Sequence, residues 1–487
     1  MTNEFSEDIQ RRVDAFNGVL SRCGMDHKKY QEDGLRWCLT NELRPVSPIG
    51  EVRGGFIADE MGLGKTILMI GTFVSNMMTK TLIILPPVLL EQWAQQIRRI
   101  TGHNPIVFHG KNKKKITLSL LNTAVIVLST YGTISVKKRT CKTSLLHEVQ
   151  WNRVVFDEGH HLRNDETDRQ FGALLLKATI RWIVSGTPIQ NKKKDFQNLC
   201  KVLNITVSDD NLQIVVDHFI LRRTKKQVGI VIPDVVNTNQ IVHWKSNQEQ
   251  NISEEIHSIL GLASSKKHNK ISSIISGQPG AILTALLRSR QSCILPKVMR
   301  NMFEGFVKDG FLSNYDSYKE GLQFSSKLDA VIDTILANKS NGCGKLVFCH
   351  FREEIDEIQS RLMAGGIHKI ASFDGRLNQA SRKDVLTQNN EVLILQIQTG
   401  CEGLNLQENY SEIYFVSPHW NPSVEDQAVA RCHRIGQVKE VKVYRFQMDN
   451  FNEERNYDGD LMEKNIETHV NQVQIDKRMI AQSVITY

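Results

Sequence analysis

The sequence predicts an α/β protein of two lobes, each with a parallel sheet covered by helices, and a helical insertion between the lobes. Three observations lead to this prediction. Short apolar runs rich in Val and Ile alternate with helical stretches in both halves of the chain, as in parallel sheets that are buried on both faces. The length of 487 residues allows two large domains or about three smaller ones. A more polar region with many Ser and Lys residues separates the two halves.

The predicted strands are short and nearly all apolar. In the first half they are Thr81 to Pro86, Ala124 to Thr130, Arg153 to Glu158 and Arg181 to Thr187. In the second half they are Lys345 to Phe351, Val392 to Gln398 and Glu412 to Pro418. The region between contains helical patches such as AILTALLRSRQSC. We therefore expect an N-terminal leader at 1–28, a first lobe at 29–236, a helical insertion or linker at 237–321, a second lobe at 322–446 and a C-terminal segment at 447–487.

Composition narrows the class of protein. Hydrophobic residues at 40% and charged residues at 23% are ordinary for a soluble globular chain. The N-terminus is polar and acidic, and no apolar run is long enough to span a membrane, so we expect no membrane partner. Nine cysteines without a C-x-x-C pair favour a reducing, intracellular compartment and argue against structural zinc. We expect the nucleus in a eukaryotic host, and otherwise the cytoplasm or a viral replication site. The net charge of +8 favours polyanionic partners.

The stretch FIADEMGLGKTILMI, which begins at Phe56, predicts a phosphate-binding loop between a strand and a helix. Such a turn directs backbone N–H groups and the positive end of the helix at a polyphosphate. The template G-x-x-x-x-G-K-[ST] is incomplete, because Asp59 stands where its first glycine falls. We expect Lys65 to bind the β and γ phosphates and Thr66 to bind magnesium; the alternative is a glycine-rich turn without a ligand. The predicted ATP-binding loop comprises Asp59, Glu60, Met61, Gly62, Leu63, Gly64, Lys65 and Thr66.

The stretch RVVFDEGHHLRN places two carboxylates directly after a predicted buried strand. Asp157 is expected to hold magnesium, and Glu158 to orient the attacking water. A solvated turn after the strand is one alternative. A metal site at His160 and His161 is another, but the pattern H-E-x-x-H is absent and no third ligand is evident. Because the lysine loop lies in the same half, the two motifs together predict a nucleoside triphosphatase.

Several motifs in one order carry a family resemblance. ADEMGLGKT, DEGHHLRN, SGTPIQN, HFILRRTKKQV and QAVARCHRIGQ resemble the motifs of the Swi/Snf family of helicase-like ATPases in superfamily two. YQEDGLRWCL resembles the adenine-reading segment of the family, LIILPPVLLEQW its first DNA-contact segment, and TGCEGLNLQENYSEIYFVSPHWNPSVEDQ its motif V region. The resemblance runs from about Lys29 to about Ile480 and implies two RecA-like lobes with ATP between them. The family also carries Asp at the position of the missing glycine.

The resemblance implies roles for further residues. Gln31 would read adenine, unless it is an ordinary polar residue on an amphipathic helix. Gln427, Arg431 and Arg434 are predicted to share one face of a helix, from which the arginines would stabilise transition-state charge at the γ-phosphate; a surface ion-pair face is the alternative. The residues expected to contact DNA, or to couple DNA to the ATP cleft, are Ser185, Thr187, Gln190, Gly400, Gly403, Asn405 and Trp420. For the first three, an ordinary turn at the end of a strand is the alternative.

The sequence also departs from its relatives in the family. Cys401 and Glu402 stand where many relatives carry small residues, and Cys293 alone in the interlobe region leaves no RING zinc finger there. The tail NIETHVNQVQIDKRMIAQSVI resembles the brace helix of the family, although a plain terminal helix would look the same. We therefore expect a minimal form of the motor, without accessory modules.

The expected function is ATP-dependent translocation on double-stranded DNA, with little sequence preference, that remodels or displaces a DNA-bound protein of unknown identity. ATP and magnesium are the expected cofactors. One alternative is a strand-separating helicase or a transcript-release ATPase. Another is a catalytically silent nucleic-acid-binding scaffold, against which the intact Lys65, Glu158, Arg431 and Arg434 argue.

Overall fold

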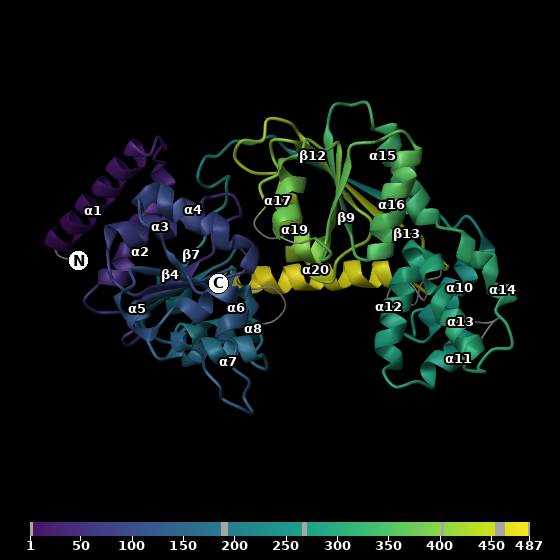
Figure 1. The fold of residues 1–487 in the computed structure, drawn as a ribbon, viewed down its shortest axis with the longest axis horizontal. Helices are drawn as coiled ribbons and strands as arrows, with labels where there is room; N and C mark the ends of the chain where they lie inside the picture. Colours follow the sequence, from purple (N-terminus) through teal and green to yellow (C-terminus); the bar gives the residue numbers. More distant parts are fainter. Residues whose placement is uncertain are drawn as a thin grey trace. The chain divides into compact units, whose positions relative to one another are not determined.

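The computed structural model describes residues 3–186, 193–264, 270–377, 379–400, 404–452 and 463–485. The chain divides into two compact units, the first comprising Met1–Val231 with Lys477–Tyr487 and the second comprising Ile232–Asp476. Figure 1 shows a sheet with helices packed around it in each unit. None of the helices in the described ranges is long and apolar enough to cross a membrane.

The first unit contains a parallel sheet of seven strands in the order β3-β4-β2-β5-β6-β1-β7. The apolar runs predicted as strands form its centre, because side chains on both faces are buried there. The strands are β1 (Gly54–Ile57), β2 (Thr81–Leu85), β3 (Ile106–Val107), β4 (Ile126–Thr130), β5 (Gln150–Asp157), β6 (Lys177–Val184) and β7 (Ile220–Leu221).

Helices cover both faces of this sheet. The α-helices are α1 (Asn3–Arg22), α2 (Lys29–Leu43), α3 (Lys65–Ser75), α4 (Leu90–Thr101), α5 (Leu118–Thr123), α6 (Tyr131–Ile134), α7 (Asp168–Leu175), α8 (Lys193–Val202) and α9 (Leu212–Phe219), joined by short 3₁₀ turns at Pro87–Leu89, Gly110–Lys115, Leu145–His147 and Gly159–Leu162. One apolar cluster packs helices α1, α2, α3 and α4 against one face of the sheet. A second apolar cluster packs helices α7, α8 and α9 against the other face.

The N-terminal segment, expected to be a leader, forms helix α1. Its buried residues Ile9, Val13, Phe16 and Leu20 follow helical spacing along one face and join the apolar cluster of α2, α3 and α4. This helix is therefore part of the core of the first unit.

The second unit contains a parallel sheet of six strands in the order β10-β11-β9-β12-β13-β8. The strands are β8 (Val235–Val242), β9 (Gly344–Cys349), β10 (Ile370–Phe373), β11 (Val392–Gln396), β12 (Tyr410–Phe415) and β13 (Val441–Met448). Helices α15 (Ser326–Ala337), α16 (Arg352–Ala364), α17 (Gln379–Thr387), α18 (Ile397–Gly400) and α19 (Pro422–Val429) accompany them, together with α20 (Ile466–Ile485) as far as Asp476. The two parallel sheets confirm the predicted α/β class.

The region between the lobes begins with a strand that the sequence did not predict. Strand β8 pairs with β13 from Val235↔Val441 to Val242↔Met448 and forms an edge of the second sheet. After β8 come helices α10 (Asn247–Ser258), α11 (Lys270–Ser276), α12 (Ala281–Ile294), α13 (Arg300–Lys308) and α14 (Asp316–Lys319), with short 3₁₀ turns at Pro296–Met299 and Gly321–Gln323. All of these elements except α12 contribute to an apolar cluster of their own, whereas Cys293 and Ile294 of α12 join the apolar cluster of the second sheet. This part is helical, as predicted.

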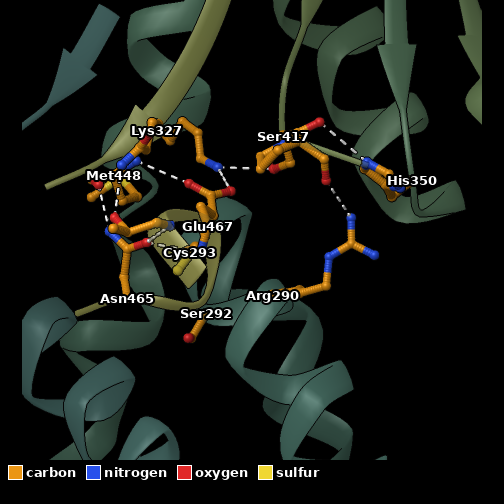
Figure 2. Close-up of polar contacts among 12 residues, drawn as sticks. Arg290, Ser292, Cys293, Lys327, His350, Ser417, Met448, Asn465 and Glu467 are labelled. Atoms are coloured by element: carbon orange, nitrogen blue, oxygen red, sulfur yellow. Dashed lines mark hydrogen bonds and ion pairs between the residues drawn. The ribbon is translucent and has the colours of Figure 1, made fainter. Parts of the chain in front are cut away.

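A buried polar network joins helices to the second sheet (Figure 2). Lys327 on α15 is fully buried, donates to Ser417 Oγ at 2.8 Å and forms an ion pair with Glu467 on α20. The backbone N–H of Met448 donates to the other Glu467 oxygen at 2.9 Å. Arg290 on α12 donates to the carbonyl of Pro418 at 3.2 Å. The network thus connects α12, α15 and α20 to the ends of β12 and β13.

Candidate active site

The phosphate-binding loop lies between β1 and α3, as predicted. Gly62 and Gly64 have φ angles of +92° and +79°, in the left-handed region that favours glycine, and Gly64 caps α3. The helix begins at Lys65, whose ammonium donates to the carbonyl of Asp59 at 2.8 Å. The loop can therefore offer backbone N–H groups and a helix N-terminus to a polyphosphate. The side chain of Lys65 is hydrogen-bonded to a carbonyl of the same loop.

Asp59, the residue in place of the first template glycine, is a buried ion-pair partner. Only 1% of its side chain is exposed. Arg223, which follows β7, donates from Nε to Asp59 Oδ1 at 3.0 Å and from Nη2 to Oδ2 at 2.5 Å. A bidentate arginine–carboxylate pair of this kind fixes both groups in one geometry. The departure from the template is thus a structural feature of the loop.

The end of β7 and the chain that follows it run alongside the loop and are hydrogen-bonded to it. The N–H of Ala58 donates to the carbonyl of Leu221 at 2.7 Å, and the N–H of Glu60 donates to that of Arg223 at 2.9 Å. Lys225 pairs with Glu60, with 3.0 Å between Nζ and Oε1. The HFILRRTKKQV motif therefore supports the loop from one side.

Asp157 lies at the end of β5 and is buried. Its Oδ2 accepts from Trp93 Nε1 at 2.7 Å, and its Oδ1 accepts from the N–H of Glu158 at 3.1 Å. Burial and the neighbouring Glu158 raise the pKa of Asp157 to about 7, against the opposing effects of Trp93 and Lys65. A buried carboxylate whose charge is disfavoured in this way suits a divalent cation, which would stabilise that charge.

Glu158 adopts a left-handed backbone conformation with φ +50°, which is uncommon for a residue other than glycine. His160 Nδ1 lies 3.3 Å from Glu158 Oε2 and 3.5 Å from Ser185 Oγ. The ring of His160 stacks on His161, with centroids 4.7 Å apart. His160 thus connects Glu158 to Ser185, at the start of the loop after β6. In the part of the chain that the structure describes, no three His, Cys, Asp or Glu side chains are grouped to hold a metal ion, so the histidine-metal alternative gains no support.

The start of the SGTPIQN motif touches the phosphate loop. A Cβ atom at Gly186 would lie 3.0 Å from Met61 Cγ and 3.4 Å from Lys65 Nζ. Ser185 is thereby placed between the loop and His160. Thr187 and Gln190 lie outside the described residues.

Gln31 on α2 reaches the other side of the loop. Its Nε2 lies 3.5 Å from the carbonyl oxygen of Leu63, and a Cβ atom at Gly64 would be only 2.5 Å from the same nitrogen. The glycine therefore leaves room for the Gln31 amide. The structure thus brings together four predicted segments of the first unit, which contain Gln31, Lys65, Asp157 and Ser185.

In the second unit the structure brings Arg431 and Arg434 next to the motif V segment. Arg434 donates from Nη1 to Asn405 Oδ1, and Arg431 Nη1 lies 3.5 Å from the carbonyl of Leu404. Burial and the charge of Arg431 lower the pKa of Arg434. Gly400 ends α18, and Gly403 lies outside the described residues.

The predicted helix face for these arginines is wrong. Helix α19 ends at Val429, so it contains the buried Gln427, but Arg431 and Arg434 lie in the turns that follow. The reason is tertiary: the carbonyl of Arg431 accepts from the N–H of Leu406 at 3.1 Å, and the chain turns toward that loop instead of continuing the helix.

Residues 30–211 match the family model of the SNF2-related domain. Residues 326–436 match that of the helicase conserved C-terminal domain. The chain belongs to the Swi/Snf family of helicase-like ATPases. It is accordingly an ATP-hydrolysing enzyme, and ATP is its nucleotide.

Relatives of this Swi/Snf-family chain include viral and cellular proteins. The probable global transactivator of Orgyia pseudotsugata multicapsid polyhedrosis virus is 28% identical over 91% of each chain. The ISWI chromatin-remodeling complex ATPase ISW2 of Saccharomyces cerevisiae is 26% identical over 88% of this chain, which spans 39% of that protein. The crystal structure of the Hef helicase domain of Pyrococcus furiosus shares the fold, with a TM-score of 0.50 and 16% sequence identity to this chain. The match covers 87% of this chain and 95% of that domain.

Three side chains in the candidate site of this Swi/Snf-family chain were not predicted. They are Trp93, Arg223 and Lys225, and all three stand in motifs that the sequence reveals. Their respective partners are Asp157, Asp59 and Glu60, and no rule of sequence spacing predicts these pairs. A buried tryptophan indicates that its indole N–H needs a hydrogen-bond acceptor, but it does not indicate which residue provides the acceptor. Trp420, expected at DNA, is half-buried and packs edge-on against His469 of α20, with centroids 6.1 Å apart.

Proposed function

We propose that the protein is an ATP-driven motor that moves along the backbone of double-stranded DNA and remodels or displaces proteins bound there. The observation that carries the proposal is the convergence of Lys65, Asp157 and Ser185–Gly186 on one loop in the first unit. The viral and chromatin-remodeling relatives and the net charge of +8 support a polyanionic substrate.

The residues of the first unit would bind and orient the nucleotide. Backbone N–H groups of the loop would hold the phosphates, and Lys65 would exchange the carbonyl of Asp59 for phosphate oxygens. Thr66 and Asp157 would hold magnesium, which neutralises phosphate charge when bound. Glu158, held by His160, would orient the attacking water.

The residues of the second unit would respond to DNA. In the proposed mechanism Arg431 and Arg434 reach the γ-phosphate when the ATP cleft closes, and stabilise transition-state charge there. The bond from Arg434 to Asn405 would couple this step to motif V, because Asn405 is also a proposed DNA contact. Ser185, Thr187, Gln190, Gly400, Gly403 and Trp420 are the other proposed contact or coupling residues. We propose an intracellular site of action, wherever the duplex substrate is found: nucleus, cytoplasm or viral replication site.

The test is ATP hydrolysis by the full chain with duplex DNA, single-stranded DNA and RNA in parallel. We expect duplex DNA of any sequence to stimulate most, and the stimulation to fall steeply with salt, because phosphate contacts release counterions and carry no direct sequence information. Lys65→Ala should abolish hydrolysis, and Glu158→Gln should bind ATP without turnover. Preferential stimulation by single strands, with separation of a forked duplex, would instead favour a strand-separating helicase. Absence of any hydrolysis would favour a silent scaffold.

A further inference from the structure

A loop of the second unit, residues 417–421, joins β12 to α19 and is held by side chains from outside it. Three successive carbonyls of the loop each accept a hydrogen bond from a side chain on a different element. The bonds run from His350 Nε2 to Ser417 at 3.2 Å, from Arg290 Nη2 to Pro418 at 3.2 Å and from Gln474 Nε2 to His419 at 2.6 Å. Backbone carbonyls away from a strand ladder need such partners, so these bonds fix the path of the loop.

The three donors come from distant parts of the sequence. His350 directly follows β9, Arg290 lies on α12 of the helical insertion, and Gln474 lies on α20. Figure 2 shows Arg290 and His350 reaching the start of the loop from different elements. The loop is therefore tied at once to the second sheet, to the insertion and to the last helix.

Arg290 is the charged member of the three. Burial lowers the pKa of its guanidinium, against the opposing charges of Glu467 and Glu354. Within the described part of the chain, the carbonyl of Pro418 is its single hydrogen-bond partner. A bond from a charged donor is stronger than one between neutral groups. The insertion thus reaches the loop through one strong bond.

The residue that follows these three carbonyls is Trp420, a proposed DNA contact. It is half-buried, and its ring lies edge-on against His469. The next residue, Asn421, caps α19 by accepting from the N–H of Ser423 at 3.2 Å. Because the backbone on both sides of Trp420 is fixed, the bonds to the carbonyls determine where the indole ring lies.

We propose that Arg290, His350 and Gln474 are positioning residues, which hold the loop in the conformation that presents Trp420 to the DNA backbone. The inference rests on the proposed function, and adds to it a role for the helical insertion in duplex binding. It gives Arg290 a task in the motor although α12 lies outside both matched family domains.

The proposed arginine fingers are held by a different segment. Arg434 bonds to Asn405, and the carbonyl of Arg431 accepts from the N–H of Leu406 at 3.1 Å. Loss of a bond to the loop should therefore weaken duplex binding and leave turnover at saturating duplex unchanged. A variant that merely destabilises the fold would not produce this separation.

The experiment measures ATP hydrolysis by the full chain over a range of duplex DNA concentrations. Arg290→Met keeps an apolar stem but removes the donor. The duplex concentration for half-maximal rate should rise about tenfold, the usual cost of losing one bond from a charged donor. Maximal turnover and ATP affinity should match the parent. Arg290→Lys should recover much of the loss, because one carbonyl needs one donor and an ammonium supplies it.

Two matched controls lie on the same helices. Arg288→Met is the control on α12, because Arg288 donates within that helix to Gln291 at 2.7 Å. On α20, Gln474→Met should raise the half-maximal duplex concentration about threefold, because its donor is neutral. Gln472→Met is its control, since the exposed Gln472 bonds to Asp476 at 3.0 Å. Both controls should match the parent.

Hydrogen exchange of the amides of His419 and Asn421, without DNA or nucleotide, tests the positioning independently of the proposed function. Exchange should be faster in Arg290→Met than in the parent or in Arg288→Met, and unchanged exchange would overturn the positioning role. Faster exchange with an unchanged half-maximal duplex concentration would overturn the role in DNA binding, as would an equal shift in Arg288→Met. If duplex DNA fails to stimulate even the parent, the proposed function itself is wrong.

Discussion

In the first unit the polar side chains at the ends of the strands lie near the proposed phosphate-binding loop, whereas in the second unit they bond to one another inside the core. Asp157 ends β5, Ser185 directly follows β6, and both lie near Lys65. His350 and Ser417 follow β9 and β12, and the imidazole Nε2 of His350 lies 3.2 Å from the carbonyl oxygen of Ser417. The same edge of a parallel sheet can therefore serve chemistry or serve to attach helices.

The difference depends on how completely buried charge is satisfied. Lys327 and Glu467 have each other, Ser417 and the Met448 N–H as partners, so their desolvation is offset within the protein. Asp157 is buried beside a second carboxylate, and its raised pKa shows that its charge is disfavoured. A cation from solution would remove that penalty.

Strand β5 contains both kinds of group. Arg153, near its start, is fully buried and bonds to Glu42 from Nε at 2.7 Å. Glu42 also accepts from Trp182 at 2.8 Å and from Asn76 at 2.7 Å. Asp157 lies four residues further along the same strand. The structural ion pair of Arg153 with Glu42 and the proposed magnesium ligand Asp157 thus lie at different positions along β5.

The largest expected effect breaks the network of the second unit. Lys327→Met should lower the free energy of unfolding by about 3–5 kcal/mol, because it leaves Glu467 buried without its cation. Urea unfolding of the full chain measures it. Lys327→Met combined with Glu467→Gln should recover much of the loss, since the amide oxygen still accepts from Met448 while the charge is gone. A cost below about 1 kcal/mol for the single variant would show that the pair behaves as a surface one.

Next in size is the effect of Arg434, which tests whether the second unit also serves chemistry. Arg434→Ala should reduce DNA-stimulated turnover by at least about a hundredfold, because an arginine finger acts mainly on transition-state charge. ATP affinity in an equilibrium assay should change little. Arg434→Lys should rescue poorly, because an ammonium cannot reproduce the planar guanidinium. Turnover near the parent rate in Arg434→Ala would contradict the proposed mechanism.

The local parts of this comparison were predictable from sequence, and the non-local parts were not. Central strands such as β2 are apolar throughout because both faces are buried, and the GKT loop is set by adjacent residues. Strand β8 is mostly exposed at a sheet edge, and its pairing with β13, some 200 residues later, has no apolar run to reveal it. The Asp59–Arg223 pair spans 164 residues and follows from the fold alone.

A smaller effect concerns pH and the buried core of the helical insertion. Burial lowers the pKa of His257 to about 4, from an ordinary value near 6.5. Its stabilising effect is complete above about pH 6.5 and is lost as pH falls toward 4, because the unfolded chain then binds the proton and the folded chain does not. Between pH 6.5 and 5 this amounts to about 2 kcal/mol.

Hydrogen exchange of the α10 amides at pH 6.5 and 5, corrected for intrinsic rates, measures this loss. His257→Gln should reduce the difference between the two pH values by most of that amount, whereas the exposed His103→Gln should leave it as in the parent. Its neighbours Ser253 and Cys293 bring no charge at these pH values. Burial raises the pKa of Glu249 on the same helix, so the comparison with His257→Gln isolates the contribution of the histidine. An unchanged difference in His257→Gln would contradict this assignment.

The smallest expected effect tests how firmly the first unit holds its carboxylate. Trp93→Phe keeps a ring in the core but removes the indole N–H that fixes Asp157 Oδ2. We expect ATP hydrolysis to fall by about tenfold, the change that a loss of about 1.4 kcal/mol in transition-state stabilisation produces. Nucleotide affinity without divalent cations should stay unchanged, since the phosphate loop is intact.

Trp151→Phe is the matched control for this prediction. Trp151 lies on the same strand as Asp157, is fully buried, and donates its indole N–H to the carbonyl of Leu146 at 2.8 Å. Both variants lose one buried hydrogen bond and should lose similar stability, of the order of 1 kcal/mol. Only Trp93→Phe frees a carboxylate at the site, so it alone should slow hydrolysis and raise the divalent cation concentration needed for half-maximal rate. Equal slowing in both variants would mean that Trp93 only fills space. A selective effect would show that Trp93, the last residue of the proposed DNA-contact segment, positions Asp157 for catalysis.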